Sequence, residues 1–282
     1  MNRLKAFWRV AVRSYTGFSE NDGTALAGYV AFASFLSLFP FAIFATAMVG
    51  VLTGPEDAQS LIDALFELAP AHIAQTIQPV IKEVTATQGG GLLTFSAVGA
   101  LWAASNAAEA TRVGFDRAFG FEEKRGFVLG RLRAIGFVLL AGLTFALLGF
   151  LIILAPLGFD LIESYTGYQV PLIADVARYA LGLGGFALFL MGLMRGLPSR
   201  PPKFRALWPG VAVTTVLWIT GATAFSIYLS FAPSYTLTYG AFAGVIVVLL
   251  FFYLTGAAII FGAEVNAALL VGKKDTTDGD DT

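Results

Sequence analysis

The sequence has no cysteine and a single histidine, His72, among its 282 residues. The lack of cysteine excludes disulfides, thiolate metal sites and cysteine nucleophiles, and it leaves the redox compartment open. The lone histidine argues against a histidine-rich metal centre. Charged residues are scarce too, at 13%, against about a quarter in soluble domains. The formal net charge of −1 gives no bulk attraction to nucleic acid, so no such partner is expected.

Long apolar runs take up most of the chain, which is 57% hydrophobic. About twenty such residues cross the hydrocarbon core of a bilayer as a helix. We therefore expect an all-α, polytopic membrane protein with a single transmembrane domain over residues 1–274. Six spans are expected, at about 24–53, 91–108, 134–156, 171–194, 207–231 and 239–271.

Four other segments are more polar than these spans. Residues 2–15 predict an amphipathic helix that lies on the inner leaflet, with a solvated basic leader as the alternative. Residues 55–88 predict two short amphipathic helices on the extracytoplasmic side. Residues 109–133 are expected to form a charged loop, and residues 275–282 an acidic, disordered tail.

The cationic residues are distributed unevenly along the chain. Sixteen of the eighteen Lys and Arg residues fall in the N-terminal segment, in the 109–133 and 195–206 loops, and at the C-terminal end. With six spans, all sixteen lie on one side of the membrane. The positive-inside rule makes that side cytoplasmic, so both termini are expected in the cytoplasm.

Polar side chains inside a span are costly and tend to face protein or water. The second and sixth spans both end on the cytoplasmic side, so their polar ends share that half of the membrane. We expect a polar floor or gate there, formed by Asn106, Glu109, Arg112, Arg131, Glu264 and Asn266. The alternative is that these groups lie at the interface and fix helix ends. Glu264 is nine residues from Lys273, roughly 13 Å along a helix, which favours a place near the inner edge.

Two further features lie in the first and fourth spans. Asp175 and Arg178 share one face of the fourth span, in its outer half, where they can pair. They either line a cavity or only form an ion pair that stabilises the helix. In the first span, Pro40 frees a backbone carbonyl one turn back, and Ser37 is a nearby hydroxyl, so a kink is expected.

Several motifs resemble the YihY/BrkB family of polytopic bacterial inner-membrane proteins. These motifs are SFLSLFP at 34–40, LWAAS at 101–105, FDRAFG at 115–120, ALWPG at 206–210, and the block at 228–268 that contains GAEVN. The similarity covers nearly the whole chain. One position departs from it, because Asp116 replaces the asparagine of the family's NRAF-like loop and adds a carboxylate beside Arg117.

The resemblance implies a multi-pass protein of the bacterial inner (cytoplasmic) membrane without an agreed activity. Names used in the family link it to virulence and serum resistance, which implies work in the cell envelope. The family has also carried the label ribonuclease BN. Phosphodiester hydrolysis usually needs carboxylate- and histidine-bound metals or a histidine acid–base pair, and this sequence supplies neither. We therefore expect no enzyme activity, no cofactor and no metal.

Two functions stay open. The first is translocation of an amphipathic or lipid-like solute, because polar groups occur within an apolar bundle. The second is a non-transporting scaffold or envelope assembly factor that docks partners through its polar segments. A polar cavity that reaches Glu264 would favour translocation, and dry helix packing around it would favour scaffolding. Expected partners are membrane lipids, a lipid-like or small amphipathic solute and, as an open alternative, further copies of the chain.

Overall fold

The computed structural model describes residues 2–53, 90–122, 126, 128–144, 171–230 and 242–277. Side chains are described there except at residues 2–4, 6, 41–53, 90–93, 96, 171–179 and 271–277. Every regular element in this part of the chain is helical, which agrees with the predicted all-α class. The elements are α1 (Asn2–Glu20), α2 (Gly23–Thr53), α5 (Gly90–Phe119), α7 (Pro171–Gly196), the 3-10 turn η1 (Phe204–Ala206), α8 (Trp208–Ser230) and α10 (Phe242–Thr277). Residues 128–144 form a further helix.

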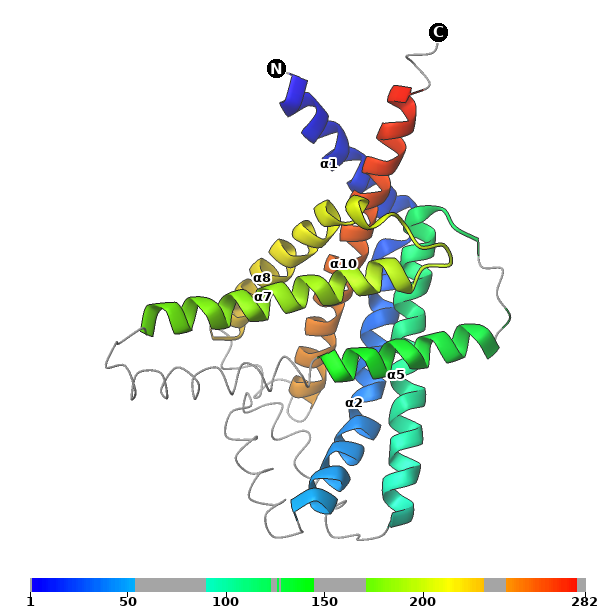
Figure 1. Cartoon of the computed structure of the whole chain (residues 1–282), viewed down its shortest axis with the longest axis vertical. Helices are drawn as coiled ribbons and strands as arrows, with labels where there is room; N and C mark the ends of the chain where they lie inside the picture. Colours follow the sequence, from blue (N-terminus) through cyan, green and yellow to red (C-terminus); the bar gives the residue numbers. More distant parts are fainter. Residues whose placement is uncertain are drawn as a thin grey trace.

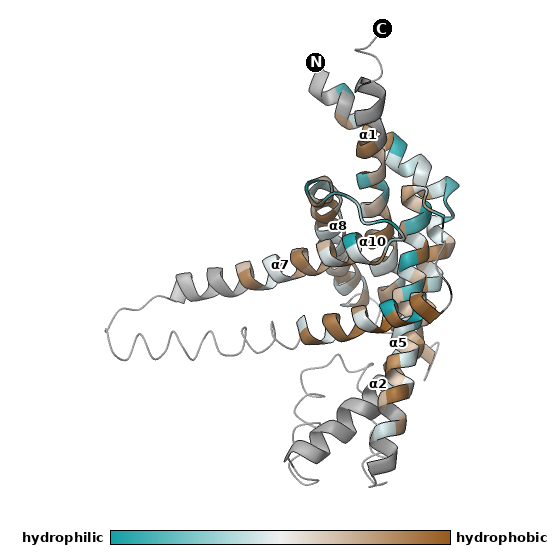
Figure 2. Ribbon diagram, turned by 45° about the vertical axis from the view of Figure 1, so that its right-hand side comes forward, coloured by the Kyte–Doolittle hydropathy of each residue, from teal (hydrophilic) through white to brown (hydrophobic). Residues whose placement is uncertain are grey.

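Helix α10 is the centre of the arrangement and packs against α1, α2, α5 and α8. Helices α2 and α5 lie side by side and run in opposite directions (Figure 1). The N-terminus and the C-terminus lie at the same end of the molecule (Figure 1). Helix α7 and the 128–144 helix run across the direction of α2 and α5 in both views (Figures 1 and 2).

A two-residue turn joins α1 to α2. The Asn21 N–H donates to the Gly17 carbonyl at 2.9 Å, which closes α1. Asp22 has a φ of 57°, in the left-handed region that aspartate tolerates better than most residues. Its carbonyl accepts from the Leu26 N–H at 2.9 Å, so α2 begins directly after the turn. Helix α1 is thus five residues longer than the predicted 2–15.

Two predicted boundaries are wrong. Helix α5 continues to Phe119 and a helix resumes at residue 128, so most of the expected 109–133 loop is helical. The reason is that acidic and basic side chains in 109–116 are spaced three and four residues apart, and such pairs stabilise a helix. Helix α10 also continues to Thr277, so the expected tail at 275–282 begins as helix. The predicted pair of helices at 55–88 lies outside the described residues.

Three described helices are long and apolar enough to cross a membrane: α8, and the segments Gly23–Pro40 of α2 and Phe242–Leu270 of α10. Ala180–Gly196 of α7 is a shorter apolar helix. Large apolar side chains stand exposed on other helices as well, among them Phe95 on α5 and Leu143 in the 128–144 helix. An apolar outer surface of this extent is suited to lipid rather than water.

Two clusters of buried apolar side chains hold the helices together, both against α10. One joins α2, α5 and α10 through Leu26, Ala27, Val30, Ala33, Ala110 and Ile260. The other joins the end of α5, the end of α7, the start of α8 and α10 through Phe115, Ala118, Leu190, Met191, Met194, Leu197, Leu207, Val211 and Ala263. Both clusters therefore depend on the part of α10 around Glu264, with Ile260 in one cluster and Ala263 in the other.

Helices α8 and α10 approach closely where a glycine of each faces the other. A Cβ added at Gly262 would overlap the Thr214 hydroxyl and would lie 2.7 Å from the Gly210 carbonyl oxygen. A Cβ added at Gly210 would overlap the Gly262 carbonyl. Small residues allow such approach between membrane helices, and Thr214 uses it to donate to the Ala258 carbonyl at 3.2 Å.

We predict that Gly262→Ala lowers the stability of the folded protein by roughly 1–3 kcal/mol, because the added methyl has backbone in its way. The matched control is Gly221→Ala in α8, where an added Cβ meets nothing within 4 Å. That control should be neutral or slightly stabilising, since alanine favours helix over glycine by about 1 kcal/mol. Unfolding of the purified protein in detergent gives both values, and equal stability of the two variants would contradict the close contact.

Candidate functional site

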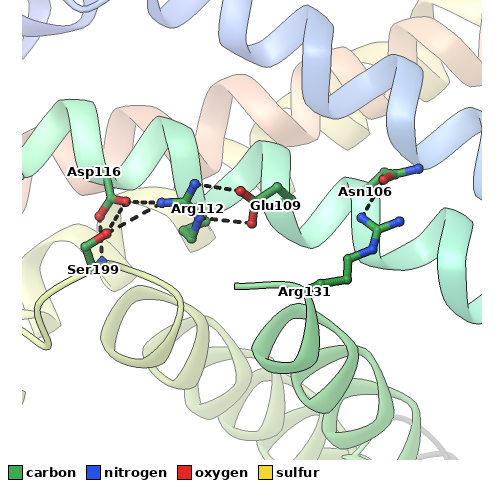
Figure 3. Close-up of polar contacts among 6 residues, drawn as sticks. All are labelled: Asn106, Glu109, Arg112, Asp116, Arg131 and Ser199. Carbon is green, nitrogen blue, oxygen red and sulfur yellow. Dashed lines mark hydrogen bonds and ion pairs between the residues drawn. The ribbon is translucent and has the colours of Figure 1, made fainter. Parts of the chain in front are cut away.

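The guanidinium of Arg112 lies between two carboxylates on α5 (Figure 3). Its Nε and Nη2 donate to the two oxygens of Glu109 at 2.9 and 2.6 Å. Its Nη1 donates to Asp116 Oδ2 at 2.6 Å. The Arg112 side chain is only 11% exposed, so it has lost most of its hydration and these charge-assisted bonds replace it.

Asp116 extends this network to another part of the chain. Its Oδ1 accepts from the Ser199 backbone N–H at 2.6 Å, and its Oδ2 accepts from the Ser199 hydroxyl at 2.6 Å (Figure 3). Ser199 belongs to the irregular segment that follows α7. One carboxylate thus fastens the α7–η1 connection to the end of α5. Arg117, beside which Asp116 was noted in the sequence, instead pairs with Asp22 at the α1–α2 turn, at 2.6 Å.

Arg131 makes a separate contact between the 128–144 helix and α5. Its Nη1 donates to Asn106 Oδ1 at 2.7 Å, and its Nη2 donates to the Trp102 carbonyl at 3.1 Å (Figure 3). The guanidinium carbon lies 3.7 Å from the centroid of the Trp102 ring, a cation–π distance. Its Nε is buried and has no hydrogen-bond partner among the described residues.

Glu264 lies on α10 and faces α1. Its Oε1 accepts from the Asn21 side-chain amide at 2.8 Å. A Cβ added at Gly17 would lie 2.5 Å from Oε2, so the absence of a side chain there makes room for the carboxylate. Glu264 is 3% exposed. Helix packing, rather than open space, therefore surrounds this carboxyl on the α1 side.

Asn266 holds the start of α8. Its Oδ1 accepts from the Gly210 backbone N–H at 2.7 Å, and its Nδ2 donates to the Leu207 carbonyl at 3.2 Å. The first N–H groups of a helix have no acceptor within that helix. Asn266 on α10 supplies an acceptor for the Gly210 N–H at the start of α8. Its Nδ2 also lies 3.5 Å from the Met194 sulfur, which adds α7 to the contact.

The six residues predicted to form one polar floor are thus divided among four contacts. Glu109 and Arg112 pair with each other, and Asn106 pairs with Arg131. Glu264 and Asn266 bind Asn21 and the start of α8 instead of the α5 residues. Glu109 and Arg112 pair within α5, whereas Asn106, Arg131, Glu264 and Asn266 each make a contact with another segment.

The other predicted site residues give less information. The side chains of Asp175 and Arg178 lie outside the described residues. The Ser37 hydroxyl donates to the Ser34 carbonyl at 2.6 Å, and not to the carbonyl one turn before Pro40. Helix α2 runs through Pro40 without a break, and its axis changes direction in its second half (Figure 1).

Sequence reasoning missed Asn21, Gly17 and Ser199 as partners. Asp116 was noted, but as a loop residue beside Arg117. The i, i+3, i+7 spacing of Glu109, Arg112 and Asp116 is the signal in the sequence for ion pairs along one helix face. Nothing in the local sequence indicates that Ser199 or Asn21 would meet these groups, because both contacts join segments far apart in the chain.

The described part of the chain contains apolar hollows but no metal-ligand cluster. No three His, Cys, Asp or Glu side chains of this part gather as metal ligands would. A hollow of about 170 Å³ lies between the 128–144 helix and α7 and has an apolar lining. Its lining residues are Phe137, Leu140, Ala141, Thr144, Leu188, Phe189, Gly192 and Leu193.

We predict that Asp116→Ala costs roughly 3 kcal/mol of stability, because it removes one of two counter-charges from buried Arg112 and leaves the Ser199 donors without an acceptor. Asp116→Asn should cost less, since its amide oxygen can still accept from Ser199. A double-mutant cycle with Ser199→Ala, measured by unfolding in detergent, should give a coupling energy above about 0.5 kcal/mol. Additive losses would show that the two residues act independently.

Comparison with known proteins identifies relatives along nearly the whole chain. A ribonuclease-like protein of Bacillus subtilis (strain 168), YfkH, is 30% identical over 265 residues, which cover 92% of this chain and 94% of that protein. A UPF0761 membrane protein of Pseudoalteromonas translucida is 25% identical, with 89% of this chain and 82% of that protein covered. A UPF0761 membrane protein of Alteromonas mediterranea is also 25% identical, with coverages of 89% and 84%. No solved structure matches the chain.

The model of one protein family, described as virulence factor BrkB, matches residues 14–281. The match includes every polar contact described above, from Asn21 to Asn266. It also agrees with the motifs that the sequence analysis singled out. The chain is therefore a member of the BrkB family, and two of the relatives above are named membrane proteins.

Proposed function

We propose that this protein translocates an amphipathic or lipid-like solute with an anionic head group across the bacterial inner membrane. In this proposal six helices span the membrane and both termini lie in the cytoplasm. The observation that carries it is the environment of Arg131, a partly buried cation beside an apolar surface, whose buried Nε has no partner among the described residues.

A buried donor without a partner costs roughly 1–3 kcal/mol, so it calls for an explanation. The Arg131 Nε is such a donor among the described residues. A carboxylate or phosphate oxygen that reached it would recover this cost with a charge-assisted bond. Asn106 and the Trp102 ring already fix the guanidinium, so the group is positioned in advance for an acceptor.

The surroundings of Arg131 are suited to the apolar part of the same solute. Val128, Leu129 and Leu132 are exposed beside it, at 60–68%. Further along the same helix lies the apolar hollow shared with α7. A molecule with an acidic head and an acyl tail would therefore find a partner for each part on one helix.

The six-span topology is supported by the positions of the cationic segments. In Figure 1 the two termini, the end of α5 and the start of α8 all lie toward one end of the molecule. The segments around these points carry most of the Lys and Arg residues. The positive-inside rule places such an end in the cytoplasm.

A scaffold that does not transport is the second candidate, and the packing of Glu264 favours it. Asn21 and Gly17 pack against this carboxyl from the α1 side. The apolar hollow between the 128–144 helix and α7 does not include Glu264 in its lining. Glu109, Arg112 and Asp116 likewise satisfy one another. These polar groups would then fix helices instead of meeting a solute.

We propose a role without catalysis and without a cofactor. The name of YfkH is ribonuclease-like, but this chain has one histidine in 282 residues and no cysteine. The remaining carboxylates of the described network are engaged in ion pairs and hydrogen bonds with Arg112, Ser199 and Asn21. Translocation and scaffolding both need such contacts, whereas hydrolysis would need a free base or a metal.

The topology can be measured directly because the chain has no native cysteine. We expect Asn2→Cys and Thr277→Cys to be protected from a membrane-impermeant maleimide in intact cells and labelled after lysis. A single cysteine within residues 55–88 is expected to label in intact cells and serves as the control. Labelling of only one of the two termini would contradict the even number of spans.

Translocation is tested by reconstitution into liposomes with head-labelled phosphatidylglycerol or phosphatidylcholine, followed by dithionite quenching. We expect movement above empty vesicles, faster for the anionic lipid. Arg131→Met should slow it by roughly tenfold or more, since a hydrogen bond to a charged group is worth about 1.5–3 kcal/mol. Arg131→Lys should recover part of the rate, because it keeps the charge but loses Nε.

The control for this assay is Arg200→Gln, which removes an exposed cation from the segment after α7. It should leave the rate unchanged. Unfolding in detergent verifies that the Arg131 variants are folded. No movement above empty vesicles for either lipid would overturn translocation, and a stoichiometric envelope partner captured by crosslinking would then favour the scaffold.

A further inference from the structure

Helix α1 has one face on α10 and another face that is open. Its second half contains buried Ser14 and half-buried Gly17, which lies against Glu264, and Phe18 meets Phe261 edge-on with ring centroids 5.9 Å apart. The first half of α1 projects, together with the end of α10, beyond the remaining helices at the end where the termini lie (Figure 1).

The open face of α1 is divided lengthwise into two stripes. Trp8, Val12 and Tyr15 follow one another at i, i+4 and i+7 and are exposed by 70%, 48% and 71%. Lys5 and Arg9 are also exposed and lie four residues apart, with Arg13 four further on. At helical spacing the first set forms an apolar stripe and the second a basic stripe beside it. No acidic residue precedes Glu20 in the sequence.

The height of this face along the molecule follows from its contact with α10. Gly17 is level with Glu264. Trp8 lies nine residues before Gly17 and Lys273 nine residues after Glu264, so both lie roughly 13 Å from that level. The two helices rise toward the same end (Figure 1). The stripes of α1 therefore lie near the basic end of the last helix, where a membrane-spanning helix meets the head groups.

We infer that α1 binds the anionic phospholipid head groups of the bilayer surface, with Lys5 and Arg9 on the phosphates and Trp8, Val12 and Tyr15 in the interfacial layer beneath them. The charge is complementary, since each cation near an anionic leaflet gains from its negative surface potential. Tryptophan and tyrosine prefer this layer of the bilayer. These five side chains are all exposed, so lipid has access to them.

This inference does not depend on translocation. An immobile scaffold would use the same surface, and a translocator with a different solute would keep it. A basic stripe alone would also suit a soluble acidic partner. The exposed aromatic stripe beside it is what favours a lipid surface, because such a partner would leave those rings in water or would need an apolar patch of its own.

The experiment uses the full chain with a single reporter, which is possible because no native cysteine competes. A fluorophore on Val12→Cys is followed in nanodiscs that contain a head-group-quencher lipid and between 0 and 40 mol% phosphatidylglycerol in phosphatidylcholine. We expect quenching to rise with the anionic lipid and to fall in 1 M salt. A fluorophore on exposed Val216→Cys of α8 is the reference, with quenching independent of lipid charge.

The matched variants are Lys5→Glu with Arg9→Glu, and the charge-preserving pair Lys5→Arg with Arg9→Lys. Charge reversal should raise the anionic lipid fraction needed for half-maximal quenching at least severalfold, whereas the charge-preserving pair should behave as the native chain. Quenching that is equal in neutral and anionic discs, or insensitive to charge reversal, would overturn the inference. Lipid dependence that appears only after residues 278–282 are deleted would also overturn it, because the acidic C-terminal end would then occupy the stripe.

Discussion

The start of α8 must satisfy its backbone inside an apolar cluster, and Asn266 on α10 does this. Its side chain accepts from Gly210 and donates to the Leu207 carbonyl, while Gly210 and Gly262 allow the two backbones to approach. An unpaired N–H in such surroundings would cost roughly 1–3 kcal/mol. The close α8–α10 contact therefore depends on one amide. The α7 end, which packs on the same cluster, depends on it in turn.

Several other polar side chains in the described part also join separate segments of the chain. Asp116 fastens the connection after α7 to α5, Asn21 fastens α1 to Glu264, and Arg117 reaches Asp22. Arg131 differs from these, because one of its donors stays unused beside exposed apolar residues. This unused donor among the described residues is why the proposed solute contact lies at Arg131 and not at Glu264.

The sequence predicts where several helices lie, but it does not predict which residues of different helices meet. Apolar length located α2, α8 and α10 closely, because a bilayer span imposes a minimum run. The predicted second span ends too early, at residue 108, because the charged residues that follow suggest a loop. Their spacing is helical, and α5 continues to Phe119. The prediction also groups Glu264 with the α5 carboxylates by depth alone. Depth follows from counting residues, but the direction of a side chain depends on how helices turn against each other, which one sequence does not contain.

The short turn at Asp22 is the covalent connection between α1 and α2. Only two residues, one of them left-handed, separate α1 from α2, and a nineteen-residue helix is roughly 28 Å long. A small rotation about this turn would move the first residues of α1 several times further than it moves Gly17, because they lie further from the turn. A force on the far end of α1 would therefore act first on the contacts of its second half with α10, Gly17 against Glu264 and Phe18 against Phe261.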